Sequence, residues 1–140
     1  MLEISRAIFD EIKSHAEASY PEECCGLLLG HLYGDRKAVL EMRRAANLNR
    51  ERANDRYLMD PKDQLAAEKH ARQASLEILG YYHSHPDHPA KASSTDDELS
   101  WEKVTYLIVS VKEGKLAHMA AFMKPNVNSS LGPEALAIHP

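Results

Sequence analysis

His83 and His85 lie two positions apart in the segment GYYHSHPDHP, directly after an apolar run and directly before Pro86. Side chains at positions i and i+2 of a strand point to the same face, so two imidazoles placed this way can reach one metal ion. Ser84, between them, is expected to point to the opposite face. The spacing therefore predicts a metal site at the end of a strand, although chance histidine pairs at this spacing also occur.

A catalytic zinc site needs a third protein ligand and keeps its fourth position open. Asp96 follows His85 by 11 residues, and the turn PDHPAKA between them could fold back and bring its carboxylate to the metal. His88, within that turn, is a rival ligand whose direction the sequence leaves open, and it is otherwise a surface loop residue. The segment SSTD also suits an ordinary helix start, with Ser93 as the N-cap and Asp96 answering it three residues later.

Glu23 stands directly before the apolar stretch CCGLLLG, where a charge needs compensation. It is either an exposed residue at the start of a strand or a general base, which must come within about 2.6 to 3.2 Å of the proton it takes. Cys24 and Cys25 should point to opposite faces of the strand, so we expect no disulfide between them. A metal-free hydrolase with Cys25 or Ser93 as the nucleophile remains an alternative.

Helices and strands that could position these side chains are indicated by periodicity and by turn residues. A first helix is expected over 5–19, capped by Ser5, with one face made of Ile8, Phe9, Ile12 and Ala16. A second should begin at Asp60 and Pro61 and run to Ala74, with Leu65, Ala67, Ala71 and Ala74 inside. A short helix should begin in SSTDDELSW.

Strands are expected at 24–32, 38–47, 76–85, 104–111 and 116–123, and EALAIH at 134–139 could form a last short strand. The turns GDRK and KEGK would make antiparallel hairpins near the two ends of the chain. Hairpins with helices between them favour the α+β class, with a mixed β-sheet flanked by helices.

The chain has 140 residues, which predicts a single domain over 1–140. Its net charge of -4 argues against nucleic-acid binding, which needs a basic face. A local exception is the arginine cluster, which is either a solvated loop or a docking patch for an acidic partner: Arg43, Arg44, Arg50, Arg52 and Arg56.

No run of 18 apolar residues is present, so we expect no membrane span. The N-terminal MLEISRAIFDEIK contains acids and no long apolar core, which argues against a secretory signal. The cytoplasm is therefore the expected compartment.

Three segments together resemble the pattern of the JAMM metalloproteases, the catalytically competent MPN domains. They are Glu23-Cys24-Cys25-Gly26-Leu27, then His83-Ser84-His85-Pro86, then Ser93-Ser94-Thr95-Asp96. The segment YYHSHPDHPAKAS is especially similar to the compact bacterial and archaeal members, and YLMDP before the second helix also looks like the family. The resemblance covers the chain from its first helix to about residue 124.

The resemblance implies a zinc-dependent hydrolase that cuts an amide or isopeptide bond after the C-terminal glycine of a ubiquitin-like protein, often a sulfur-carrier protein in compact prokaryotic members. His83, His85 and Asp96 would bind zinc, Glu23 would be the general base and Ser93 would support the oxyanion. Cys25 matches a structural cysteine of the family. The implied fold is a curved mixed sheet with flanking helices, similar to that of cytidine deaminases.

Two departures limit what the resemblance implies. The segment 97–101 passes quickly into the next strand and leaves no room for the long insertion with which larger eukaryotic deubiquitinases grip ubiquitin chains. The C-terminal PNVNSSLGPEALAIHP matches nothing in the family pattern.

Other functions remain as alternatives to this family. A deaminase would need a Cys-x-x-Cys pair, which is lacking. A non-catalytic MPN scaffold is the main alternative, although such scaffolds typically lack the ligand set. The sequence leaves open the carrier, the group released and the oligomeric state.

Overall fold

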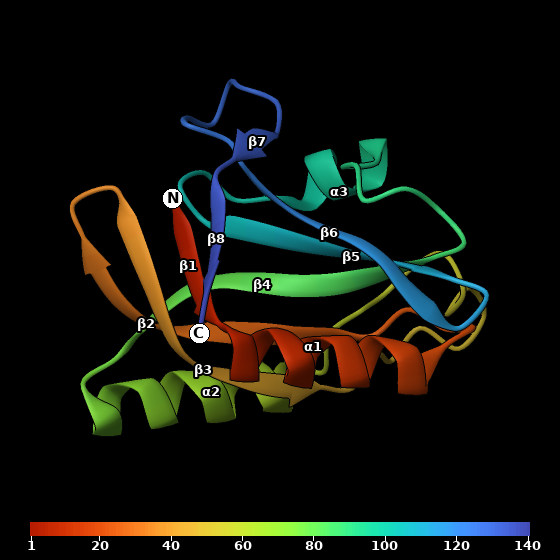
Figure 1. Cartoon of the computed structure of the whole chain (residues 1–140), viewed down its shortest axis with the longest axis horizontal. Coiled ribbons are helices and arrows are strands. Elements are labelled where there is room, and N and C mark those ends of the chain that lie inside the picture. The colour runs from red at the N-terminus through yellow and green to blue at the C-terminus, as the bar shows by residue number, and fades with distance from the viewer.

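One eight-stranded mixed sheet runs through the molecule, in the strand order β7-β6-β5-β4-β2-β3-β1-β8. The computed structural model describes all residues, 1–140 (Figure 1). The elements are β1 Leu2–Ser5, α1 Arg6–Ser19, β2 Cys25–Tyr33, β3 Arg36–Ala45, α2 Pro61–Ala74, β4 Glu77–Pro86, α3 Ser94–Leu99, β5 Thr105–Lys112, β6 Lys115–Met123, β7 Gly132–Glu134 and β8 Leu136–His139. This architecture confirms the predicted α+β class with a mixed sheet and flanking helices.

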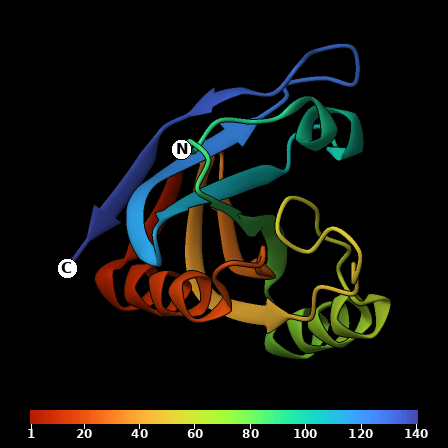
Figure 2. The ribbon, with the colours of Figure 1, turned by 90° about the vertical axis from the view of Figure 1, so that its right-hand side faces the viewer.

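The sheet curves until its two edges approach each other (Figures 1 and 2). β7 pairs with β6 at one edge and β8 pairs with β1 at the other, yet only Ala135 separates these two strands in the chain. The backbone N–H of Leu2 donates to the carbonyl of Ala135 at 2.8 Å, which ties the N-terminal strand to this junction. The last strand was expected from EALAIH, whereas β1 and β7 were not predicted.

Local start signals act as predicted in both long helices. The Ser5 hydroxyl accepts a hydrogen bond from the N–H of Ile8 at 3.2 Å at the start of α1. The Asp60 carboxylate accepts one from the N–H of Lys62 at 2.9 Å, and Pro61 occupies the first turn of α2. These caps satisfy amide groups that have no partner within the helix.

The two long helices cover opposite faces of the sheet. In α1, Ile8, Ile12 and Ala16 are buried as predicted and pack in a core cluster with sheet residues that include Tyr82. In α2, Ala67 and Ala71 pack in a second cluster, with Cys25, Leu27 and Leu29. Cys24 belongs to the first cluster and Cys25 to the second, and both are free, which confirms that the two side chains point to opposite faces.

The inner side predicted for α2 is wrong in two of its four residues. Leu65 is 64% exposed and Ala74 is also exposed. α2 contacts the sheet through a stripe of small residues at i and i+4, Ala67 and Ala71, which permits a close approach. Leu65, two positions before Ala67, is rotated away from that stripe and faces solvent.

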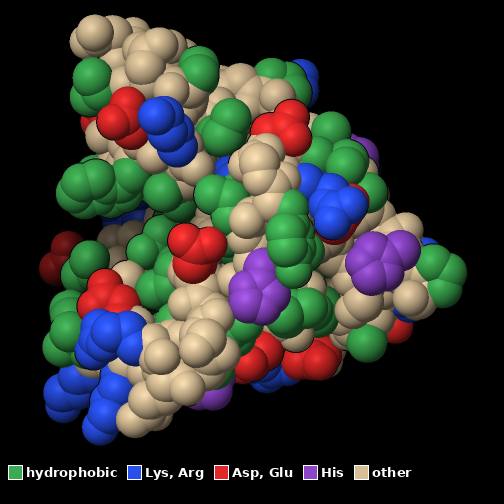
Figure 3. All heavy atoms as spheres, turned by 90° about the vertical axis from the view of Figure 1, so that its left-hand side faces the viewer, with side chains coloured by type: hydrophobic (Ala, Val, Ile, Leu, Met, Phe, Trp, Pro, Cys, Tyr) green, Lys and Arg blue, Asp and Glu red, His purple; other side chains and the backbone are tan.

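Figure 3 shows the end of the molecule opposite to that in Figure 2. Acidic and basic side chains are interspersed there with apolar ones (Figure 3). None of the helices combines the length and the apolar character needed to cross a membrane.

Candidate functional site

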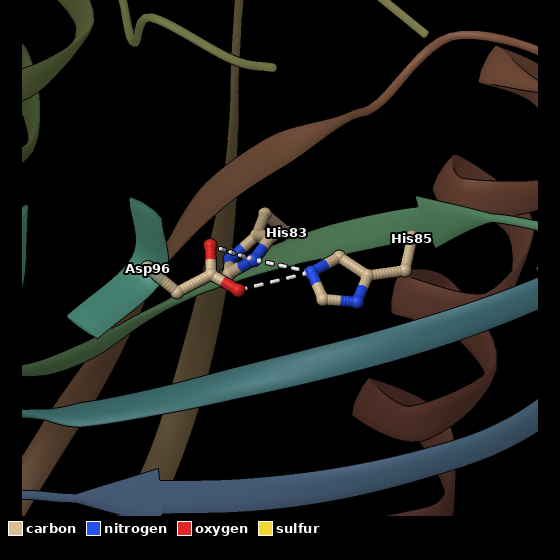
Figure 4. Close-up of side chains that lie close together, drawn as sticks. All are labelled: His83, His85 and Asp96. Atoms are coloured by element: carbon tan, nitrogen blue, oxygen red, sulfur yellow. Dashed lines mark hydrogen bonds and ion pairs between the residues drawn. The ribbon is translucent and has the colours of Figure 1, made fainter. Parts of the chain in front are cut away.

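The end of β4 presents two imidazoles on one face, and α3 supplies a carboxylate next to them (Figure 4). The Nε2 atoms of His83 and His85 are 3.2 Å apart. Asp96 places Oδ1 3.1 Å from Nε2 of His83 and Oδ2 3.1 Å from Nε2 of His85. The structure therefore brings together the three side chains that the sequence singled out as metal ligands.

The geometry of this cluster suits a tetrahedral zinc ion. Two ligand atoms that each lie 2.0 to 2.1 Å from a tetrahedral metal are separated by about 3.3 Å. The separations of 3.1 to 3.2 Å between the donor atoms are close to that value. Two imidazole nitrogens and one carboxylate are also a ligand set that catalytic zinc uses.

The rings of His83 and His85 also make contacts with residues other than Asp96, and these contacts orient them. Nδ1 of His85 lies 2.9 Å from the carbonyl oxygen of Pro89, and since a carbonyl only accepts, this nitrogen carries the proton. In a neutral ring the Nε2 atom of His85 then keeps its lone pair for a metal. The ring of Tyr57 stacks on His83 with centroids 4.7 Å apart, while Nδ1 of His83 is buried without a hydrogen-bond partner.

The charges in the cluster follow from burial and from the hydrogen bonds. Burial acts to raise the pKa of Asp96, but the hydrogen bonds with His83 and His85 outweigh it and hold that pKa well below its usual range. Burial lowers the pKa of His83. Burial also acts to lower the pKa of His85, but Asp96 and the Pro89 carbonyl reverse this and the net pKa is raised. Asp96 is therefore ionised, as a metal ligand must be.

Glu23 lies in the loop before β2 and is buried, with 7% of its surface exposed. Burial raises its pKa to about 7, with His85 lowering it and Asp96 raising it. Its N–H donates to the carbonyl of Ala53 at 2.6 Å. Its side chain lines the same groove as the three clustered side chains. Glu23 is thus a buried carboxylate at the site rather than an exposed residue at the start of a strand.

Ser84 fixes the backbone of Cys24 and Asn47 that of Glu23, and neither role was predicted. Ser84 points away from the histidines, as expected, and its hydroxyl accepts a hydrogen bond from the N–H of Cys24 at 2.8 Å. The side-chain amide of Asn47 donates to the carbonyl of Glu23 at 3.1 Å. A serine between two candidate ligands was the available signal for the first contact. No signal in the sequence indicated the contact between Asn47 and Glu23, because the two residues are far apart in the chain.

Ser93 caps α3 in a reciprocal arrangement. Its hydroxyl oxygen accepts from the N–H of Asp96 at 3.0 Å, and Oδ2 of Asp96 accepts from the N–H of Ser93 at 2.8 Å. The capping role is therefore confirmed. Because the cap uses the hydroxyl oxygen as an acceptor, the hydroxyl hydrogen remains free, and Ser93 lines the groove where it could donate.

Several other candidates lie outside the cluster. His88 is exposed in the turn after β4 and is not one of the three grouped side chains. Burial raises the pKa of Cys24 to about 11 and that of Cys25 to about 12, so both are thiols at neutral pH and neither is an activated nucleophile.

The arginine cluster does not form one patch. Arg43 and Arg44 are on β3, where their side chains alternate between faces, and Arg50 is exposed in the following loop. Arg52 and Arg56 line the groove.

A groove of about 800 Å³ contains the cluster. One wall comes from the loop 47–60 and the other from the turn after β4 and from α3. Figure 2 looks onto this end, with the loop in yellow and α3 in teal beside the end of β4. The groove is large enough for an extended peptide tail to reach the clustered side chains.

Comparisons with known proteins agree with these features. The family described as prokaryotic homologs of the JAB domain matches residues 5–123. A desampylase of Haloferax volcanii is 32% identical over 78% of this chain and 80% of its own length. A probable TtuB-protein conjugate cleaving protease of Thermus thermophilus is 31% identical, covering 77% and 69%. A CysO-cysteine peptidase of Mycobacterium tuberculosis is 30% identical, covering 81% and 75%.

Solved structures show the same fold. A solution structure from Desulfitobacterium hafniense superposes with a TM-score of 0.85 at 30% identity, covering 99% of this chain and 92% of the other. A JAB1/MPN domain protein from Archaeoglobus fulgidus, at 17% identity, gives a TM-score of 0.60 with 99% of each chain covered, and so supports the fold alone. The match over residues 5–123 and the relatives at 30% identity or more place this chain in the prokaryotic JAB family.

Proposed function

We propose that this protein is a zinc-dependent peptidase that hydrolyses the amide bond after the C-terminal glycine of a ubiquitin-like or sulfur-carrier protein. The observation that carries the proposal is the convergence of His83, His85 and Asp96 on one point in a groove that Glu23 also lines. Relatives named as a desampylase, a TtuB-conjugate protease and a CysO-cysteine peptidase support this class of substrate.

His83, His85 and Asp96 would hold the zinc ion in this proposal. Zinc, when bound, supplies a Lewis acid that polarises the scissile carbonyl and lowers the pKa of a water from 15.7 to about 7. The ionised Asp96 adds negative charge to the ligand set, which makes the metal a gentler acid than three neutral imidazoles would. In this proposal the carbonyl of the carrier's last glycine would lie in the groove at this point.

Glu23 would act as the general base and then as the general acid. Its carboxylate accepts the proton of the attacking water, and the same side chain passes that proton to the leaving amine. Burial raises the pKa of Glu23 to about 7 in the protein without metal, and the charge of a bound zinc ion would lower it, which favours the carboxylate that accepts the first proton. The hydrogen bonds from Asn47 and to Ala53 hold its backbone in place during this transfer.

Ser93 would stabilise the oxyanion that develops on the scissile carbonyl. Its hydroxyl hydrogen is not used by the helix cap, and its side chain lines the groove. A donor fixed by a cap needs little reorganisation when charge develops, which is the condition under which such hydrogen bonds accelerate a reaction.

The test compares Glu23→Gln with its neighbour Glu22→Gln, which changes an exposed carboxylate next to the site. We expect Glu23→Gln to retain zinc and fold while losing turnover of a carrier conjugate by at least about 1,000-fold, because the transferred proton has no acceptor. Glu22→Gln should keep wild-type turnover. Because it still binds substrate, Glu23→Gln should also retain the physiological conjugate in a pull-down.

Full turnover by Glu23→Gln would remove Glu23 from the mechanism. Full activity after removal of all metal by a chelator would exclude zinc catalysis. A zinc-loaded wild-type protein that binds carrier conjugates but cleaves none of them would instead support a non-catalytic scaffold.

A further inference from the structure

Three cationic side chains line the groove, and only one of them is neutralised by a carboxylate. Arg52 pairs with Asp55, with Nε 3.0 Å from Oδ1 and Nη2 on Oδ2. Arg56 and Lys91 take part in no ion pair. The one hydrogen bond of the Arg56 guanidinium runs from Nη1 to the backbone carbonyl of Asp55 at 2.9 Å. Most of its five N–H donors are therefore free to bind an anion.

Asn47 ties the backbone of Arg56 to that of Glu23. The Nδ2 atom of Asn47 donates to the carbonyl of Glu23 at 3.1 Å and to the carbonyl of Arg56 at 3.2 Å. Its Oδ1 atom accepts from the N–H of Leu58 at 2.9 Å, which fixes the segment on the far side of Arg56. Burial is the main cause of the raised pKa of Glu23, and the charge of Arg56 makes a small opposing contribution. Arg56 is thus the free cation on the Glu23 side of the groove.

We propose that Arg56 binds a carboxylate on the leaving group, so that the enzyme preferentially releases a free amino acid from the carrier's C-terminal glycine. This inference rests on the proposed function, in which Glu23 hands its proton to the leaving amine, so the leaving group lies on the Glu23 side. Hydrolysis breaks the C–N bond, the water's oxygen goes to the glycine carbonyl carbon, and the amine leaves with a proton. The products are the carrier with a glycine carboxylate and an amino acid with its own α-carboxylate.

The chemistry separates this leaving group from the other candidates. An α-linked terminal amino acid carries a carboxylate one carbon away from the scissile nitrogen. A lysine ε-amine in an isopeptide has no charge there, and an internal peptide bond offers only a neutral carbonyl. A guanidinium matches a carboxylate with two parallel hydrogen bonds, which distinguishes the first case from the others.

The experiment uses CysO and TtuB, after which two of the relatives are named, each in three C-terminal forms. The forms end in glycine linked to cysteine with a free carboxylate, to the same cysteine as a carboxamide, and to the lysine ε-amine of a peptide. For the zinc-loaded wild type we expect kcat/KM for the free acid to exceed that for the carboxamide by about 10- to 100-fold, the value of a charge-assisted hydrogen bond. In Arg56→Gln this ratio should collapse to about one, and Arg56→Lys should restore part of it.

Two matched variants serve as controls. Arg50→Gln removes an exposed arginine of the same loop that does not line the groove, and it should keep the wild-type ratio. Lys91→Gln removes the other unpaired cation, which is on the opposite wall, and it should also keep the ratio. Thermal unfolding of each variant shows whether it is folded at the assay temperature.

Three results would overturn the inference. Equal cleavage of acid and carboxamide by the wild type, or faster cleavage of the isopeptide, would remove the carboxylate preference while leaving the proposed function intact. Collapse of the ratio in Lys91→Gln but not in Arg56→Gln would show that Lys91, and not Arg56, binds the carboxylate. Cleavage of none of the forms by the zinc-loaded wild type would contradict the proposed function, and this inference with it.

Discussion

β4 is in contact with histidine side chains on both of its faces, half-buried His15 of α1 on one and its own buried His83 and His85 on the other. On the α1 face, Nδ1 of His15 lies 2.7 Å from the hydroxyl of Tyr82, and no carboxylate pairs with the ring. On the groove face, His83 and His85 share Asp96. Burial, with a smaller contribution from Arg44, lowers the pKa of His15 to about 4, whereas Asp96 helps to raise that of His85.

The contrast shows how neighbouring residues of one strand serve packing and chemistry separately. Tyr82 is fully buried against α1, and its ring lies so close to Gly26 that a Cβ there would clash with it. Ser84, on the same side, fixes the backbone of Cys24. These contacts support β4 from behind, so that the groove face can present its buried imidazoles with fixed geometry.

The largest expected effect comes from removing a proposed metal ligand on the groove face. Asp96→Asn keeps an oxygen for the helix cap but removes the charge that a metal requires, and His85→Ala removes a donor nitrogen. We expect each to weaken zinc binding by more than about 100-fold, because even partners behind metal ligands typically contribute 10- to 100-fold. Elemental analysis after dialysis against a zinc buffer measures the loss.

The matched control for that loss is Glu98→Gln, which neutralises an exposed acid of the same helix. On the other face of β4, His15→Gln should likewise leave the zinc content unchanged. Undiminished zinc in both Asp96→Asn and His85→Ala would show that the two faces do not differ in the way described.

A second, smaller effect is expected at Ser93, which caps α3 and is also the proposed donor to the oxyanion. Ser93→Gly removes the hydroxyl but costs only a few tenths of a kcal/mol as an N-cap. We therefore expect nearly wild-type thermal stability together with a fall in kcat of about 100- to 1,000-fold. Steady-state kinetics and thermal unfolding on the same preparation separate the two roles. A kcat within a few-fold of wild type would restrict Ser93 to capping.

The smallest effect is expected on the α1 face, in the pH dependence of stability. The folded-state pKa of His15, about 4, is below the unfolded value of about 6.5, so the unfolded chain binds more protons between these pH values. Stability should therefore fall as the pH drops from about 6.5 toward 4. With a discount for partial exposure, His15 should account for about 1 kcal/mol of the loss between pH 7 and pH 5.

Urea unfolding of zinc-loaded wild type and His15→Gln at pH 7 and pH 5 isolates the contribution of His15 to the free energy of unfolding, because the two proteins share all other titratable groups. The variant should lose less stability on acidification than the wild type does. An equal loss in both proteins would mean that His15 is not held neutral by the fold.

The sequence predicted most of what is local in this molecule. The helix caps at Ser5 and Asp60 and the same-face placement of His83 and His85 follow from short-range geometry, and the structure has all of them. The convergence of Asp96 on the histidines required the family pattern as well, because a turn of unknown path separates them.

What could not be predicted depends on contacts between distant segments. β1 has only four residues and is defined by its partners β3 and β8, so its own sequence carries little strand signal. α2 packs on the sheet through Ala67 and Ala71, and its own sequence does not show that this side of the helix, rather than the side of Leu65, faces the sheet. The amide of Asn47, which bridges Glu23 and Arg56, likewise becomes visible only when all three segments are folded.

Anomalous diffraction at the zinc edge, on crystals of the wild-type protein loaded with one equivalent of zinc, tests the proposed catalytic site most directly. We predict a single peak within about 2.0 to 2.2 Å of Nε2 of His83, Nε2 of His85 and a carboxylate oxygen of Asp96, with the Glu23 side chain facing it. A peak elsewhere on the chain, or none between these three side chains, would contradict the assignment.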